Sequence, residues 1–316
     1  MNGTLPPRVA VLIPCHNEAV TIAAVVGDFR RQLPDAAVYV FDNRSSDDTA
    51  RIAAAAGAEV RSVTLLGKGN VVRRMFADVE ADVYVMADGD GTYDAGAAGM
   101  LVDKLLAESL DMVVGSRVSE EAAAYRSGHR LGNAMLTHSV GFLFGSTFTD
   151  MLSGYRVFSR RYAKSFPANA TGFEIETELT VHALQQRMPV AEVATRYGAR
   201  PEGSASKLNT WRDGLRVLLT IFNLYKSEKP LAFYSLAFSL CSAAAVILAV
   251  PIFEVYFQTG LVPRIPTAML CTGLVLLGVI LLACGLVLDT VTRGRKEAKR
   301  LAYLSIPAPA RGGRRQ

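Results

Sequence analysis

The sequence of 316 residues has few cysteines and few charged residues. None of its four cysteines forms a CxxC pair, which argues against a cysteine zinc site and against a disulfide framework. Charged residues make up 20% of the chain and hydrophobic residues 50%, which excludes a disordered or fibrous chain and argues against a purely soluble protein. No apolar stretch precedes Val9, so a signal peptide is not expected and the N-terminal part is predicted to be cytoplasmic.

The net charge of +5 would be compatible with a nucleic-acid partner, but its distribution argues against one. Residues 292–316 contain eight basic residues and one acidic residue, a local charge of +7 that leaves −2 for residues 1–291. The basic character therefore belongs to a short C-terminal tail, and no nucleic-acid partner is predicted.

Two long uncharged apolar runs are present, Leu231–Phe253 and Ile265–Leu288. As helices, each would extend roughly 35 Å, enough to cross a bilayer core of about 30 Å. Lysines and arginines flank the outer ends of this hairpin, whereas the linker 254–264 has one arginine. The positive-inside rule then predicts a multi-pass protein of the plasma (inner) membrane with both termini in the cytoplasm. The alternative is a buried helical hairpin in a soluble domain.

A stripe of large apolar residues precedes the first run, at spacings of four and three: Trp211, Leu215, Leu218, Phe222 and Tyr225. This pattern predicts a helix that lies either at the lipid headgroups or against the core of the preceding domain. The predicted organisation is therefore a domain at 1–207, a juxtamembrane helix at 208–230, a transmembrane hairpin at 231–291 and a basic cytoplasmic tail at 292–316.

Residues 8–117 alternate between short apolar runs and helical patterns. Strands are predicted at Val9–Ile13, Ala37–Phe41, Glu59–Val63, Val83–Ala87 and Met112–Gly115, with helices near Val20–Arg31, Asp47–Ala56, Asn70–Val79 and Gly96–Ala107. This alternation predicts an α/β fold with a Rossmann-like, mostly parallel sheet, whose ligands bind beyond the carboxyl ends of the strands.

Polar residues follow four of these predicted strands, at Pro14–Glu18, Asp42–Thr49, Asp88–Thr92 and Ser116-Arg117. One such segment could be a helix cap, but four at one edge predict a site. Asp88 and Asp90 point to the same side of an extended segment, and two carboxylates suit Mg²⁺ or Mn²⁺. A surface turn is the alternative.

Two other sequence patterns bear on the same edge. Gly67-Lys68-Gly69-Asn70 opens a predicted helix and could attract phosphate, although it lacks the spacing of a Walker loop. The Asp-x-Asp-Gly-Thr sequence does not fit an EF-hand, because its twelfth position is Gly99 rather than Glu. A phosphatase of the haloacid dehalogenase type remains an alternative for Asp88 and Asp90.

Together these motifs resemble the family-2 glycosyltransferases of the GT-A fold, above all the polyprenyl-phosphate (dolichol-phosphate type) enzymes, from about Arg8 to Lys207. The matching motifs are Ile13–Glu18 (IPxxNE), Asp42, Lys68-Gly69, Asp88-Gly89-Asp90 (DxD), Gly115–Arg117 (GSR), Arg130 with Asn133 (RxxN) and Ser153–Arg156 (SG[FY]R). The segment Gly203–Lys207 resembles the family's GxSK segment. Asn43-Arg44 departs from the usual DDGS motif and Thr92 from the usual Gln, which affects base recognition and the third metal contact. The DGDGTY variant resembles a subgroup that favours UDP-sugars.

The resemblance implies inverting transfer of a sugar from a nucleotide-sugar to a polyprenyl phosphate at a lipid bilayer, by a homo-oligomer such as a tetramer. It assigns nucleotide-sugar binding to Pro14, Cys15, Asn17, Glu18, Asp42, Lys68, Gly69, Asp88, Gly89 and Asp90. Asp88 and Asp90 would hold the divalent cation, Mg²⁺ or Mn²⁺. Asp90, Arg117 and Arg130 are the predicted catalytic residues, and Arg117, Arg130 and Lys207 would bind the lipid phosphate, because cations position an ionised phosphate. Surface salt bridges are the alternative role of the two arginines.

Three glutamates follow in Gly172–Leu179, of which Glu178 best matches a family glutamate. Glu174 and Glu176 are interpreted either as sugar contacts or as a solvated helix face. His16 is expected to support the nucleotide loop, and no role is assigned to His129, His138 or His182. A glycosyltransferase-like scaffold without activity is the second alternative function.

Overall fold

The computed structural model describes residues 6–118, 135, 137–142, 145, 148–172, 174–201 and 210–307, with the backbone alone at 210–218. The chain forms two compact units. The first comprises Met1–Val217 with Lys299–Gln316, and the second comprises Leu218–Ala298.

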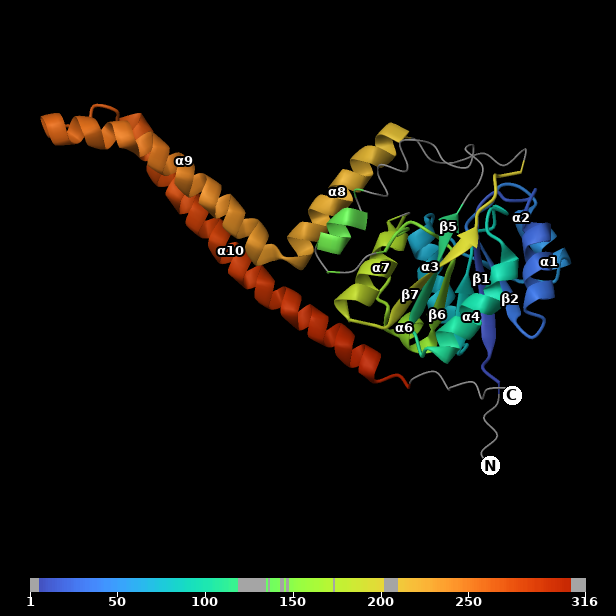
Figure 1. Ribbon diagram of the computed structural model, residues 1–316. Helices are drawn as coiled ribbons and strands as arrows, with labels where there is room; N and C mark the ends of the chain where they lie inside the picture. The colour runs from blue at the N-terminus through green and yellow to red at the C-terminus, as the bar shows by residue number, and fades with distance from the viewer. Residues whose placement is uncertain are drawn as a thin grey trace. The chain divides into compact units, whose positions relative to one another are not determined.

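The first unit contains a mixed sheet covered by helices on both faces (Figure 1). Its strands are β1 (Val9–Cys15), β2 (Ala37–Asp42), β3 (Glu59–Ser62), β4 (Val83–Met86), β5 (Met112–Val118), β6 (Arg156–Ser159) and β7 (Val190–Arg196). Within the described residues the order is β3-β2-β1-β4-β6-β5-β7. All neighbouring pairs are parallel except those of β6, which runs antiparallel between β4 and β5.

Two layers of helices enclose this sheet. The helices are α1 (Ile22–Gln32), α2 (Thr49–Ala55), α3 (Lys68–Asp78), the short η1 (Ala95–Ala97), α4 (Ala98–Ala107), α6 (Arg160–Ser165) and α7 (Ile175–Gln185). The core cluster on one face joins α1, α2 and α4 to the strands. On α3, Phe76 makes edge-to-face contacts with Tyr84 and Phe158, at centroid distances of 5.9 and 5.4 Å. Because both faces are covered, the central strands are continuous apolar runs.

The α/β fold and the mostly parallel sheet are confirmed, but β6 and β7 are missing from the sequence prediction. Strand β6 is short and begins with Arg156, whose charge hides the strand in a hydropathy pattern. This side chain is fully buried and is satisfied locally, since it donates to Ser153 O (2.8 Å), Met151 O (2.5 Å) and Thr180 Oγ1 (2.9 Å).

The second unit is built on long helices: α8 (Thr210–Glu228), α9 (Pro230–Thr259) and α10 (Ile265–Leu304), of which α8 and α10 extend beyond it. By length and composition, α9 and α10 are suited to cross a membrane. Both continue past the predicted spans, because hydropathy marks the apolar stretch and not the helix end. Helix α9 runs through the first half of the predicted linker to Gly260, which has a left-handed φ of 68°. Helix α10 runs into the segment predicted as a tail.

The juxtamembrane segment is helical, as predicted. Leu219 and Phe222 are 53% and 52% exposed, and the Phe222 ring lies edge-on to Phe233 of α9 at 5.2 Å. The interfacial placement of α8 remains a prediction.

A buried carboxylate joins the end of α8 to α10. Glu228 is 8% exposed and forms ion pairs with Lys296 (3.1 Å) and Arg295 (3.7 Å). The Thr292 hydroxyl and the Arg295 guanidinium donate to Ser227 O at 3.3 and 3.2 Å. Basic residues that follow the second apolar run therefore have carboxylate and carbonyl partners within the protein.

Glycines allow α9 and α10 to pack closely, side by side (Figure 1). A Cβ at Gly285 would lie 2.8 Å from Tyr234 Cβ, whereas one at Gly273 would meet no atom within 4 Å. Gly285→Leu should therefore separate the helices and destabilise the hairpin by about 1–3 kcal/mol, as overpacking does. The measurement is thermal unfolding of the full-length protein in detergent, with Gly273→Leu as the matched control. Equal effects of the two substitutions would contradict the packing.

His182 of α7 makes stability depend on pH. It is 1% exposed, and neither ring nitrogen has a hydrogen-bond partner within the described residues. Burial lowers its pKa to about 3, and the charge of Lys299 acts in the same direction. The unfolded chain binds a proton at this histidine below about pH 6.5. This contribution to stability is therefore complete above pH 6.5 and is lost as the pH falls from 6.5 towards 3.

His182→Phe should flatten the acid side of the stability profile. Between pH 6.5 and 4.5, the slope of the free energy of unfolding should decrease by up to about 1.4 kcal/mol per pH unit. Urea unfolding of both proteins across this range measures the slopes, and parallel profiles would rule out the contribution of His182.

Candidate functional site

Strands β1, β2 and β4 end at one edge of the sheet, as the sequence predicts. Cys15 at the end of β1 lies in register with Asp42 at the end of β2, and Asp88 follows β4, the other neighbour of β1. Three of the four predicted polar segments therefore meet where parallel strands present their carboxyl ends, which is the usual ligand edge of such sheets.

The loop after β1 is tied to the loop after β2. The backbone N–H of Asn17 donates to Ser45 Oγ at 2.9 Å, and Asn17 Oδ1 accepts the N–H of Ser46 at 2.7 Å. The N–H of Glu18 donates to Thr49 Oγ1 at 2.8 Å. The loops after β1 and β2, both predicted to bind the nucleotide, are thus joined into one continuous surface by hydrogen bonds.

One carboxylate oxygen of Asp42 has no hydrogen-bond partner within the described residues. The residue is 7% exposed, and its Oδ2 accepts the N–H of Ser45 at 3.2 Å. Its Oδ1 is buried and has no hydrogen-bond partner within the described residues. A buried acceptor without a donor is costly, so this oxygen is suited to an N–H group of a ligand.

Asn43, where this chain departs from the family motif, holds the next loop. Its Nδ2 donates to Leu65 O (2.7 Å) and Val63 O (3.1 Å), and its Oδ1 accepts the N–H of Gly67 (2.7 Å). His16 Nδ1 lies 2.8 Å from Asn43 O, which fits the supporting role expected of this histidine. Asn43 thereby fixes the residue that precedes Lys68.

Lys68 connects Asp88 of the candidate metal site to Glu176, which the sequence predicts to be a sugar contact or part of a solvated helix face. Glu176 is 4% exposed, so the solvated-face interpretation is wrong for this residue. Its Nζ lies 2.5 Å from Asp88 Oδ1 and 2.6 Å from Glu176 Oε1, and its side chain is 10% exposed. Burial favours the neutral amine, but the charges of Asp88 and Glu176 outweigh it and raise the pKa of Lys68. The amine therefore remains protonated between two carboxylates.

The lysine turn is packed against a second turn at 169–171. A Cβ at Gly67 or Gly69 would lie 2.1 Å from a carbonyl oxygen of this turn, and Gly67 has a left-handed φ of 119°. Glu178 holds the turn by accepting the N–H groups of Asn169 (3.0 Å) and Ala170 (2.7 Å). Glu178, which best matches the family glutamate, therefore stabilises the turn at 169–171. Glu176 is the glutamate that contacts Lys68.

Asp90 also pairs with a cation that sequence reasoning missed. Its Oδ2 lies 2.6 Å from Arg200 Nη2, and its Oδ1 accepts the Thr92 hydroxyl at 2.6 Å. Thr92 thus orients Asp90. Within the described residues no three His, Cys, Asp or Glu side chains form a metal-binding group. The two aspartates still provide the hard oxygen donors that Mg²⁺ or Mn²⁺ prefers, and substrate oxygens and water would complete the coordination.

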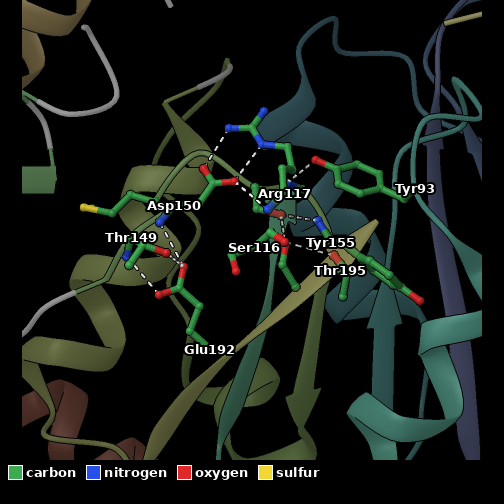
Figure 2. A network of polar contacts seen from close by, with 12 residues as sticks. Tyr93, Ser116, Arg117, Thr149, Asp150, Tyr155, Glu192 and Thr195 are labelled. Atoms are coloured by element: carbon green, nitrogen blue, oxygen red, sulfur yellow. Dashed lines mark hydrogen bonds and ion pairs between the residues drawn. The ribbon is translucent and has the colours of Figure 1, made fainter. Parts of the chain in front are cut away.

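Arg117 forms a two-pronged ion pair with Asp150 (Figure 2). Its Nε and Nη2 donate to the carboxylate at 2.7 Å each, and Glu192 accepts the N–H groups of Asp150 (2.9 Å) and Thr149 (2.8 Å). Burial opposes the charge of Arg117, but the hydrogen bonds to Asp150 outweigh it and raise its pKa. Arg117 is thus firmly positioned, and its phosphate role stays a prediction. Arg130, Asn133 and Lys207 lie outside the described residues.

Tyr93 lies beside these charged groups, although the sequence analysis assigned it no role. Its hydroxyl accepts the N–H of Gly154 at 2.8 Å (Figure 2). A Cβ at Gly154 would lie 2.6 Å from Asp88 Oδ2, so this glycine allows the close approach. Burial and the charge of Asp88 raise the pKa of Tyr93, which keeps the phenol protonated at neutral pH. The sequence feature that could have identified Tyr93 as a site residue is its position directly after Asp-Gly-Asp-Gly-Thr.

Gly89 must be a glycine because Cys15 lies against it. A Cβ at Gly89 would lie 2.5 Å from Cys15 Sγ, whereas the next contact, Ile13 Cγ2, is at 3.4 Å. Gly89→Ala should therefore destabilise the first unit by about 1–3 kcal/mol, and Cys15→Ala in the same chain should restore most of the loss. Unfolding midpoints of the two single variants and the double variant complete the cycle. Additive effects would contradict the contact.

Comparisons with known proteins agree with this geometry. Residues 10–166 match the family described as glycosyl transferase family 2. Glycosyltransferase AglJ of Haloferax volcanii is 33% identical over 302 residues, covering 95% of this chain and 99% of that protein. A dolichyl-phosphate hexose transferase of the same organism is 27% identical, covering 70% of this chain and 95% of the relative.

A crystal structure of glucosyl-3-phosphoglycerate synthase from Mycobacterium tuberculosis, in complex with Mn²⁺, uridine-diphosphate and phosphoglyceric acid, has a similar fold. The TM-score is 0.55 at 25% identity, over 68% of this chain and 78% of that chain. The motifs, the sheet and the full-length relative together place this chain in glycosyl transferase family 2, with the GT-A fold.

Proposed function

We propose that this glycosyltransferase moves a sugar, with inversion, from a UDP-sugar to a polyprenyl phosphate in the membrane. The observation that carries the proposal is the presence, in one chain, of the Asp42–Asp88–Asp90 edge and of two helices suited to cross a membrane. The name of the 27% identical relative, a dolichyl-phosphate hexose transferase, supports the acceptor class.

Asp42 supports uridine as the nucleoside. One of its oxygens is occupied by the Ser45 N–H, and the other lacks a partner within the described residues. Uracil presents one imide N–H, which matches this single oxygen, whereas guanine presents two adjacent donors. The solved neighbour that contains uridine-diphosphate supports the same choice.

Asp88 and Asp90 would hold Mg²⁺ or Mn²⁺ against the diphosphate. A divalent cation there supplies the charge that stabilises the leaving group. Lys68, the first residue of α3, keeps Asp88 aligned, and Arg200 and Thr92 orient Asp90. These contacts fix the positions of the two carboxylates before the nucleotide binds.

The acceptor phosphate needs cations more than a base. Its second pKa is about 6, so one of its oxygens is already a nucleophile at neutral pH. Arg117, Arg130 and Lys207 are proposed to bind this phosphate, with the prenyl chain in the lipid. We further propose the plasma membrane, a cytoplasmic catalytic domain with both termini on that side, and a homo-oligomer such as a tetramer.

The test is a transfer assay with the full-length protein in detergent. It combines polyprenyl phosphate, Mn²⁺ or Mg²⁺ and a panel of UDP- and GDP-sugars, and a lipid-linked monosaccharide should form from a UDP-sugar. Asp90→Ala should lower the rate by roughly a hundredfold or more. Asp103→Ala, which removes an exposed carboxylate from α4, is the matched control.

Two results would exclude transfer as the function. Absence of product with every donor would favour the inactive scaffold, and phosphate release without a nucleotide-sugar would favour the phosphatase alternative.

A further inference from the structure

The hydroxyl of Tyr93 has a hydrogen that no described residue accepts. Its oxygen accepts the N–H of Gly154 at 2.8 Å, and within the described residues that is its one hydrogen bond. A phenol can donate and accept at the same time, so the O–H remains available to a ligand. The residue is half-buried, which leaves part of its surface accessible.

The ring of Tyr93 is held firmly, so the direction of this hydroxyl is set by the fold. Its centroid lies 5.4 Å from that of Tyr155 and 5.3 Å from that of Tyr197. Backbone bonding between Tyr93 and Tyr197 also forms an isolated antiparallel bridge. The hydroxyl thus requires little ordering when a ligand arrives, which makes its hydrogen bond more favourable.

The hydroxyl lies between two parts of the site with different proposed tasks. On one side, Gly154 links it to Asp88, which is proposed to serve the donor diphosphate. On the other side, Arg117 lies over the ring of Tyr197, which packs against Tyr93. The guanidinium carbon of Arg117 is 5.5 Å from the ring centroid of Tyr197. Figure 2 shows the Tyr93 hydroxyl pointing towards Arg117.

We propose that Tyr93 donates a hydrogen bond to an anionic oxygen of the acceptor phosphate and orients it beside Arg117. The assignment rests on the proposed function. In the reaction, an acceptor phosphate oxygen forms the bond to the anomeric carbon while the bond from that carbon to the diphosphate oxygen breaks. The electron pair leaves with the diphosphate, and Tyr93 keeps its proton throughout.

Tyr93→Phe in the full-length protein tests this assignment, with Tyr155→Phe as the matched control. Tyr155 belongs to the same aromatic cluster, but its hydroxyl is buried and has no hydrogen-bond partner within the described residues. Three kinetic and binding quantities are measured for each protein, alongside its unfolding temperature. They are kcat/KM for polyprenyl phosphate at saturating UDP-sugar, the affinity for UDP with Mn²⁺, and the affinity of the UDP–Mn²⁺ complex for farnesyl phosphate by calorimetry.

Tyr93→Phe should lower kcat/KM for the acceptor roughly tenfold to a hundredfold, as expected for a lost hydrogen bond to an anion. Farnesyl phosphate should bind correspondingly more weakly, UDP affinity should change less than about twofold, and Tyr155→Phe should leave all three near wild type.

Three outcomes would overturn the assignment. A weaker affinity for UDP with an unchanged acceptor KM would mean that the phosphate belongs to the donor. A lower unfolding temperature with unchanged acceptor constants would mean that the hydroxyl only supports Gly154. A wild-type protein that makes no lipid-linked sugar and binds no farnesyl phosphate would overturn the proposed function, and this assignment with it.

Discussion

The ion pairs of Lys68 with Asp88 and Glu176 hold together the parts of the molecule that form the active site. They connect the start of α3, the segment after β4 and the first turn of α7. Lys68 and Glu176 are deeply buried and require their partners, because removal of one leaves an uncompensated charge in a poorly solvated place. The surroundings support this arrangement: Asn43 fixes Gly67, and Glu178 holds the turn on which the two glycines beside Lys68 pack.

The same side chains set the charge of the site before any substrate arrives. Asp88, Asp90 and Glu176 carry three negative charges, and Lys68 and Arg200 carry two positive charges. These five side chains therefore sum to one negative charge, which a divalent cation would turn into one positive charge. The negative charge of a nucleotide diphosphate offsets this positive charge. The electrostatics therefore favour joint binding of cation and nucleotide over binding of the cation alone.

The sequence predicts the parts of the site that depend on local geometry. Asp88 and Asp90 are predicted because side chains two residues apart share a side of an extended segment, and Asp42 because it ends a buried strand. Glu176 and Arg200 depend on tertiary structure, since α7 and the segment after β7 lie far along the chain from Lys68 and Asp90, with which they pair. Tyr93 likewise depends on contacts with residues distant in sequence, Gly154 and Tyr197. Helix ends in the second unit are missed for another reason: Tyr256 and Phe257 continue α9 beyond a charged residue that hydropathy treats as a boundary.

The C-terminal charge acquires a different meaning in the structure. As a sequence feature, the +7 of residues 292–316 suggests attraction to anionic lipid headgroups. In the second unit, however, Arg295 and Lys296 pair with the buried Glu228, and Arg293 pairs with Asp289. An unpaired basic residue near an anionic leaflet contributes about 1 kcal/mol of attraction. Paired charges contribute less, so these three residues fall below that figure. The topology prediction is unaffected, because the positive-inside rule counts lysines and arginines near the helix ends and gives acidic residues little weight.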